Sequence, residues 1–189
     1  MARRSLYSRG AFAPAREEIT AVDLPVTGRI PDDLDGRYLR NGPNPIGIEH
    51  PRAHYFLGAG MIHGVRIRDG RAEWYRNRWI RQAPVSRALG EERRAYTVLG
   101  GMDGSSNTNV IGRGGRVLSL VEGGTLPFEL GDELETLGPC DFQGELRSGM
   151  SAHPKVDPHT GELHTVGYFA GSPTVDYHVI SNDGRIVRS

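Results

Sequence analysis

The stretch that decides the fold class is Met61-Ile-His-Gly-Val-Arg-Ile-Arg-Asp-Gly-Arg-Ala-Glu-Trp-Tyr-Arg-Asn-Arg-Trp-Ile80. Two runs of alternating apolar and polar residues flank Asp69-Gly70, and such a pair is the strongest short signal for a β-hairpin because its tight turn needs positive φ at both central residues. The sequence therefore predicts a hairpin over residues 61–80. A second pair, Asp183-Gly184, predicts another over residues 174–188.

Other segments of the sequence also carry the signals of short strands. Short strands are predicted from Gly36 to Arg40, where Asn41-Gly-Pro-Asn-Pro45 stops the chain, at residues 109–111, 116–121 and 126–130, and on both sides of the turn at residues 157–161. One helix is predicted, over Arg87–Ala95, before the break at Gly100-Gly101. Short strands with regular turns and almost no helix predict an all-β sandwich, barrel or propeller, and periodicity does not choose between them.

Residues 1 to about 35 carry few paired strand signals, and Pro14, Pro25 and Pro31 interrupt them repeatedly. Proline removes a backbone donor and fixes φ, which disfavours central strands. We therefore expect residues 1–35 to form an extended N-terminal arm that wraps a body made of residues 36–189.

Composition excludes some classes of partner. The 189 residues hold 23 basic and 23 acidic side chains, so no net field favours nucleic acid or an anionic membrane surface. The single cysteine, Cys140, excludes an internal disulfide and fits a reducing compartment. No window approaches the roughly 18 to 20 apolar residues of a spanning helix. We expect a soluble, cytoplasmic protein without a nucleic-acid partner, and peripheral membrane contact stays open.

The segment Ser151-Ala-His-Pro-Lys-Val-Asp-Pro-His-Thr-Gly-Glu-Leu163 places one histidine, His153, at the start of a predicted hairpin. Pro154 biases His153 toward extended backbone, and Asp157-Pro158 with Thr160-Gly161 supplies the turn. An isolated histidine in such a place is usually a surface or packing residue, so the segment needs further support before it can be read as a site.

Six segments together supply that support. They are Gly36-Arg-Tyr-Leu-Arg-Asn-Gly-Pro-Asn44, Gly60-Met-Ile-His-Gly-Val-Arg66, Asn77-Arg-Trp79, Asn107-Thr-Asn109, Glu122-Gly-Gly124 and Ala152-His-Pro-Lys155. In this order they resemble the N-terminal portion of the carotenoid cleavage oxygenase (retinal pigment epithelial membrane protein) family, from about Gly36 to Ser189. The resemblance implies a seven-bladed β-propeller. A four-stranded blade takes roughly 40 to 45 residues, so this chain holds at most about four blades, and we expect the C-terminal blades to be missing from it.

The resemblance also implies a reaction. Members of the family hold one Fe(II) on the propeller axis through four histidines, and insert dioxygen across a carbon–carbon double bond of an apolar polyene to give two carbonyl products. Imidazole ligands and open coordination positions suit such chemistry. His153 matches the first of the four histidines, and the other three are expected further along a complete chain.

The resemblance suggests roles for two more residues. Glu122 occupies the position of a glutamate that, in the family, hydrogen-bonds one of the later liganding histidines, and this would fix the tautomer and ring orientation of that histidine. The alternative is a solvated glutamate at a strand end. Trp79 is a candidate for lining the polyene tunnel, and a buried core tryptophan is the equal alternative. His63 does not match a ligand position, and we expect a structural role for it or a role behind the ligands.

The residue before Glu122 bears on the substrate. Stilbene-cleaving relatives tend to carry a lysine there, which handles the substrate phenol. Val121 cannot donate a hydrogen bond to a phenolate, and this favours a carotenoid or apocarotenoid over a stilbene. A stilbene-cleaving dioxygenase stays the alternative within the family.

Two hypotheses outside that reading stay open. One is a local metal site built from His153, His159 and His164, and the other is an inactive, truncated β-sheet module that only binds. The propeller hypothesis predicts that His153 projects toward the region of Glu122 and the end of the Asn107–Asn109 strand. It also predicts that the 189-residue chain alone is metal-poor, inactive and prone to aggregate, because one imidazole holds iron poorly and an unclosed sheet exposes its edge.

Overall fold

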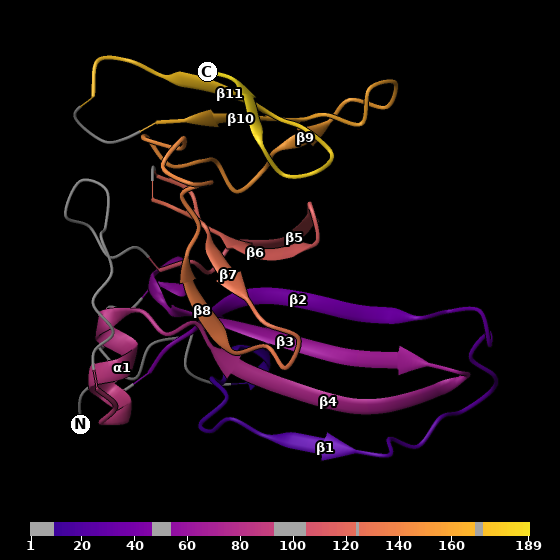
Figure 1. Cartoon of the computed structure of the whole chain (residues 1–189). Helices are drawn as coiled ribbons and strands as arrows, with labels where there is room; N and C mark the ends of the chain where they lie inside the picture. The colour runs from indigo at the N-terminus through magenta and orange to yellow at the C-terminus, as the bar shows by residue number, and fades with distance from the viewer. Residues whose placement is uncertain (1–9, 47–53, 93–104, 124, 169–171) are drawn as a thin grey trace, which may run out of the picture.

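Three four-stranded antiparallel sheets make up most of the structure, a computed structural model that describes residues 10–46, 54–92, 105–123, 125–168 and 172–189 (Figure 1). The first sheet has the order β1 (Thr20–Val22), β4 (Arg71–Trp79), β3 (Ala59–Arg68), β2 (Gly36–Asn44). The second runs β5 (Asn109–Arg113), β6 (Arg116–Leu120), β7 (Phe128–Leu130), β8 (Thr136–Pro139). The third runs β12 (Ile186–Arg188), β11 (Asp176–Ile180), β10 (Leu163–Gly167), β9 (Lys155–Val156). Three short helical segments are described: η2 (Gly10–Phe12), η3 (Tyr55–Leu57) and α1 (Ala83–Leu89).

Both predicted hairpins are confirmed. β3 and β4 pair from Met61↔Trp79 to Arg68↔Arg71, and the two turn residues between them have positive φ, 49° at Asp69 and 69° at Gly70. These angles are those of the tight hairpin turn that Asp-Gly favours. β11 and β12 pair across the turn that contains Gly184, whose φ is 77°. The predicted pair around residues 157–161 is also present, as β9 and β10.

The predicted helix is misplaced. α1 covers Ala83–Leu89 and ends at Gly90, which takes the left-handed conformation with φ 69°. Pro84 lies in its first turn, where the missing N–H costs nothing and the fixed φ suits the helix. The prediction relied instead on the Leu, Glu and Ala pattern of residues 87–95 and did not use the proline and glycine that mark the ends of the helix. Residues 93–95 lie outside the described residues.

Strand β2 is longer than predicted. It continues through Asn41-Gly-Pro to Asn44, which pairs with Ala59. The proline is tolerated because β2 pairs with β3 on one side only, so a missing donor on the open side breaks no ladder. Two further strands were not predicted at all. They are β1 and β8, each of three or four residues.

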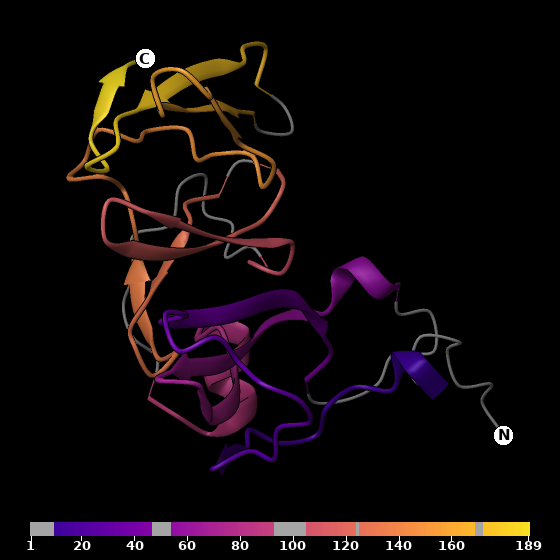
Figure 2. The same ribbon diagram turned by 90° about the vertical axis from the view of Figure 1, so that its right-hand side faces the viewer.

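The sheets stack face to face, with the second between the first and the third in both views (Figures 1 and 2). One apolar cluster fills the space between the first and second sheets and includes Ile62, Trp74, Phe128 and Leu130. A larger cluster fills the space between the second and third sheets, and is formed by Leu118, Leu120, Leu126, Cys140, Phe142, Leu146, Met150, Ala152, Leu163 and Ile180. Successive sheets packed in this way match the blade arrangement of a propeller.

Two close contacts fix the second sheet on the first. Leu134, in the turn between β7 and β8, is fully buried in the first of these clusters, although its φ of 68° is unusual for leucine. At Gly60 on β3, an added Cβ would lie 2.1 Å from the carbonyl oxygen of Ser106. Only glycine fits there, because the obstacle is backbone and cannot rotate away.

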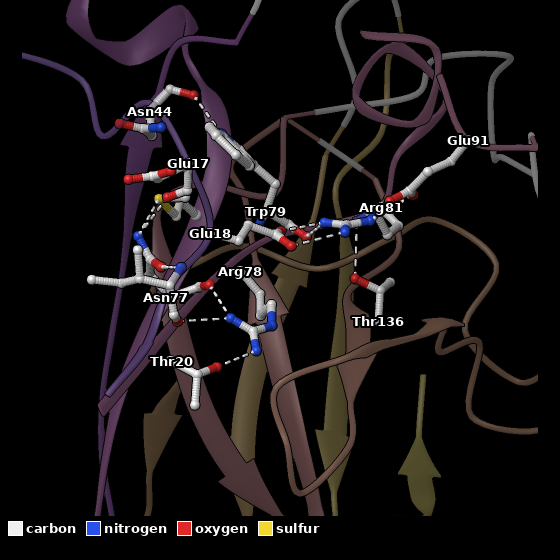
Figure 3. Close-up of polar contacts among 12 residues, drawn as sticks. Glu17, Glu18, Thr20, Asn44, Asn77, Arg78, Trp79, Arg81, Glu91 and Thr136 are labelled. Atoms are coloured by element: carbon white, nitrogen blue, oxygen red, sulfur yellow. Dashed lines mark hydrogen bonds and ion pairs between the residues drawn. The ribbon is translucent and has the colours of Figure 1, made fainter. Parts of the chain in front are cut away.

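The segment before β1 is attached to the first sheet by polar contacts rather than by apolar packing alone (Figure 3). Asn77 on β4 accepts the Ile19 N–H at Oδ1 over 2.6 Å. Arg78 donates to the carbonyl oxygen of Ile19 over 2.9 Å and to Thr20 Oγ1 over 2.7 Å. β1 then pairs with β4, so part of the segment before residue 36 completes the first sheet. A domain boundary near residue 35 stays a prediction.

No helix within the described ranges is both long and apolar enough to cross a bilayer.

Candidate metal centre

The carboxylate of Glu122, just after β6, is the meeting point of three chain segments. Its Oε1 accepts the Ala152 N–H over 3.0 Å and the Ser151 hydroxyl over 3.1 Å, and its Oε2 accepts the Tyr168 hydroxyl over 2.6 Å. The bond to Glu122 raises the pKa of the Tyr168 phenol, because the neutral hydroxyl is the form that donates. Glu122 therefore ties the end of β6 to the segment that carries His153 and to the end of β10.

The backbone of residues 151–153 is held from other sides as well. The Ser151 N–H donates to the carbonyl oxygen of Val166 over 2.7 Å. The Ala152 carbonyl accepts from Asn109 Nδ2 over 2.8 Å, and the His153 N–H donates to the Ser151 hydroxyl over 3.1 Å. Ala152 itself is fully buried. The backbone before His153 is thus fixed at successive polar groups.

His153 lies beside Glu122, as the propeller hypothesis predicted, and the residue before it contacts Asn109. The ring Nε2 is 3.5 Å from Glu122 Oε1, longer than an ordinary hydrogen bond, and the His153 side chain is 63% exposed. The structure therefore brings the three predicted positions together. The metal role of His153 and the orienting role of Glu122 stay predictions.

An iron ion fits this site only in part. A neutral imidazole on a rigid, extended segment is a suitable donor for Fe(II), and His153 presents its ring on an open face. Among the described residues, however, no three His, Cys, Asp or Glu side chains gather into a group that could hold a metal. His153 can supply one corner of an iron site, and further donors have to come from elsewhere.

The hypothesis of a local three-histidine site finds no support. His159 lies in an exposed turn, where its N–H donates to Asp157 Oδ1 over 2.7 Å. His164, on β10, uses its Nδ1 in a hydrogen bond with the hydroxyl of Tyr177. The hairpin register sets Lys155, not His153, opposite His164. The three imidazoles are therefore not brought together.

Two other residues singled out from the sequence lie in the first sheet, away from this junction of the second and third sheets. Trp79 is 3% exposed, packs with Met61 and Val85, and donates its indole N–H to the carbonyl oxygen of Asn44 over 3.2 Å. These are the contacts of a core residue. The adjacent cavity of about 350 Å³ is lined largely by charged side chains, which do not suit a polyene. The tunnel role stays a prediction.

His63 has a structural environment in the first sheet. Its Nδ1 lies 2.8 Å from the hydroxyl of Tyr75, on the neighbouring strand. Burial lowers the pKa of His63, and the charge of Arg40 lowers it further. A neutral ring hydrogen-bonded to a phenol fits the structural role that we expected for it.

Sequence reasoning placed Asn109 near the site without assigning its contact, and it missed Tyr168. Asn109 belongs to the motif Asn107-Thr-Asn109, but a motif does not reveal that its amide reaches the carbonyl before His153. Tyr168 lies 46 residues from the glutamate that it contacts. A contact of such sequence separation leaves no local signal, because it depends on how the third sheet packs against the second.

Comparison with known proteins identifies the class. The family model described as retinal pigment epithelial membrane protein matches residues 12–189. The chain therefore belongs to this family, which includes the carotenoid cleavage oxygenases. The carotenoid cleavage oxygenase of Mycobacterium tuberculosis is 54% identical in an alignment of 187 positions that covers 97% of this chain and 37% of that protein.

Solved structures of similar proteins support the fold class. The lignostilbene dioxygenase of Pseudomonas brassicacearum superposes with a TM-score of 0.80 at 29% identity, over 98% of this chain and 42% of that one. A cobalt-substituted apocarotenoid oxygenase of Synechocystis gives 0.74 at 27% identity, over 93% and 42%. These matches confirm the predicted fold class, all-β and part of a propeller. The chain spans about two fifths of the length of these relatives.

Proposed function

We propose that the complete protein to which this chain contributes is an Fe(II)-dependent dioxygenase that cleaves a carbon–carbon double bond of a carotenoid or apocarotenoid. The observation that carries the proposal is the position of His153. Its imidazole is exposed on one side, while the backbone behind it is fixed by Glu122 and Asn109. The family and the relative named a carotenoid cleavage oxygenase support the same reaction class.

In this proposal His153 would be one ligand of the iron, and the metal would supply the activation of dioxygen. Glu122 keeps the segment of His153 in place through the Ala152 N–H and the Ser151 hydroxyl. The cobalt-substituted structural relative supports a metal site in this fold.

The other three ligands belong, on this proposal, to blades that the chain does not contain. The third sheet is consistent with a further blade beside it. Its strands and their neighbours leave large apolar side chains exposed, at Val175, Tyr177 and Val187. The polyene and dioxygen are the small-molecule partners, and the cytoplasm is the proposed compartment.

A stilbene is the second candidate substrate, because the structurally similar lignostilbene dioxygenase is named for one. Val121 argues against it. An isopropyl side chain beside Glu122 can neither pair with a phenolate nor donate to it. An extended apolar chain needs no such donor.

The test uses the full-length protein, purified anaerobically and reconstituted with Fe(II). We expect about one iron per chain and aldehyde or ketone products from an apocarotenoid under air, with little product from resveratrol. His153→Ala should lose both the iron and the products. His159→Ala is the matched control, since this exposed histidine lies on the same hairpin and should leave both unchanged. Full activity of His153→Ala would refute the proposal.

A further inference from the structure

Ala152, the residue before His153, is clamped by hydrogen bonds to two side chains, Asn109 on β5 and Glu122 just after β6. The N–H of Ala152 donates to Glu122 over 3.0 Å, and its carbonyl oxygen accepts from the amide of Asn109 over 2.8 Å. Both peptide bonds that flank Ala152 are therefore held, and the residue is fully buried. Its backbone cannot rotate without breaking one of these hydrogen bonds.

Asn109 is itself part of a repeated contact between neighbouring sheets. Asn41, on β2 of the first sheet, directs its amide Nδ2 at the carbonyl oxygen of Asn109 over 3.0 Å. Asn109, on β5 of the second sheet, directs its Nδ2 at the carbonyl oxygen of Ala152, just before the third sheet. Each asparagine thus reaches from an edge strand of one sheet to the backbone at the start of the next. The series ends one residue before His153.

The position of the imidazole depends on this backbone because most of the His153 side chain, 63%, is exposed. Its Nε2 lies 3.5 Å from Glu122 Oε1, which is longer than an ordinary hydrogen bond. On the other side of His153, Pro154 restricts its backbone to extended conformations. The direction of the Cα–Cβ bond of His153 is therefore set by the Ala152 clamp in front and the proline behind.

We propose that Asn109 is a positioning residue for the metal. By holding the Ala152 carbonyl it fixes the direction in which His153 presents its imidazole, so that the ligand is in place before the metal arrives. This inference rests on the proposed function. A metal site gains affinity from ligands that are already in place, and loss of a supporting contact typically weakens metal binding about tenfold to a hundredfold.

The test compares Asn109→Asp with Asn107→Asp in the full-length protein. Aspartate keeps the size of asparagine but cannot donate, so it repels the carbonyl that it faces. Asn107 is the matched control, because its Nδ2 also donates to backbone carbonyl oxygens, those of Phe56 and Gly58, in contacts that do not involve residues 151–153. Near-UV circular dichroism verifies that each variant is folded at the temperature of the assay.

The first readout is the dissociation constant for Co(II), measured from the visible absorption bands of the bound metal. We expect Asn109→Asp to raise this constant about tenfold to a hundredfold, and Asn107→Asp to leave it within about threefold. The second readout needs no metal. Amide hydrogen exchange of the peptide that contains residues 151–153 should become faster in Asn109→Asp alone.

Equal effects of the two variants on Co(II) binding would overturn the inference, because the loss would then come from general destabilisation. Unchanged exchange at residues 151–153 in Asn109→Asp would overturn it too. A wild-type protein that takes up no Co(II), despite a protected segment, would instead refute the proposed function, and the role of Asn109 toward the metal with it.

Discussion

The carboxylate of Glu18 forms a two-point ion pair with the guanidinium of Arg81, and each side chain is only 21% exposed (Figure 3). Glu18 Oε1 also accepts the Trp79 N–H over 2.7 Å, and Arg81 bonds Glu91 through Nε over 2.8 Å. The Arg81 N–H donates to Thr136 Oγ1 on β8 over 2.9 Å. The ion pair and the hydrogen bonds around it therefore join the segment before β1, the chain after β4 and the residues that follow α1, and they connect these to β8 of the second sheet.

Replacing Glu18 by glutamine should destabilise the protein. Glutamine keeps the shape and can still accept from Trp79, but it leaves the half-buried charge of Arg81 with a weaker set of partners. Hydrogen bonds to charged groups are worth about 1.5 to 3 kcal/mol, so we expect a loss of this order in the free energy of urea unfolding. Glu17→Gln is the control, because the neighbouring Glu17 is exposed. Equal losses in both variants would argue against a specific role for the pair.

The same pair predicts a pH dependence. Burial alone would raise the pKa of Glu18, but the hydrogen bonds from Arg81 and from the Trp79 N–H, with the charge of Arg81, lower it below its usual value of 4.5. A carboxylate with a lowered pKa in the folded state binds protons less readily than in the unfolded state. Its stabilisation is therefore complete above about pH 4.5 and is lost as the pH falls further.

Urea unfolding of the wild type and of Glu18→Gln across this range checks the sign. The difference in unfolding free energy between them should be constant near neutral pH and should shrink below about pH 4.5. A difference that grew on acidification would contradict the assignment.

Much of the fold follows from local chemistry that the sequence displays. Asp69-Gly70 predicts the β3–β4 hairpin because few residue pairs accept positive φ twice, and the structure has positive φ at both. Strands such as β8, with four residues, do not show enough alternation to be recognised. How the sheets stack depends on long-range contacts such as the burial of Leu134 in the apolar cluster between the first and second sheets, and the periodicity of the sequence does not reveal these.

The candidate site likewise contains residues that the sequence identifies and residues that it does not. His153 and Glu122 could be chosen from the sequence because each occupies a short motif of the family. That their side chains would be neighbours was an inference from the propeller, and the 3.5 Å distance agrees with it. Asn109 and Tyr168 could not be assigned, because their contacts depend on the packing of one sheet on the next and on strand register.

Leu134 should be one of the most sensitive core positions. It is fully buried against Leu39 and Ile62 of the first sheet, and truncation would leave a cavity between the first and second sheets. Leu134→Ala should lower the unfolding free energy by about 2 to 5 kcal/mol. Leu137→Ala on β8 is the matched control, since Leu137 is 51% exposed and should cost far less. Comparable losses in both would mean that the turn does not anchor the second sheet.

The 189-residue chain expressed alone should bind metal poorly. Within the part of the chain that the structure describes, His153 does not belong to a group of three or more side chains that could hold a metal. A mononuclear site owes its affinity to several ligands held together, and a lone imidazole competes with water at a disadvantage. We therefore expect the chain to leave the absorption spectrum of Co(II) almost unchanged, with or without the substitution His153→Ala.

The apolar surface of the third sheet gives the same experiment a second readout. Val175 is 66% exposed and Val187 56%, so copies of the chain should associate through this face or through the open edge of β12. Light scattering should show association that Val187→Lys reduces, while metal uptake stays low in both proteins. Near-stoichiometric Co(II) in the associated chain, lost in His153→Ala, would contradict this expectation, because it would mean that His153 residues of several copies meet around one ion.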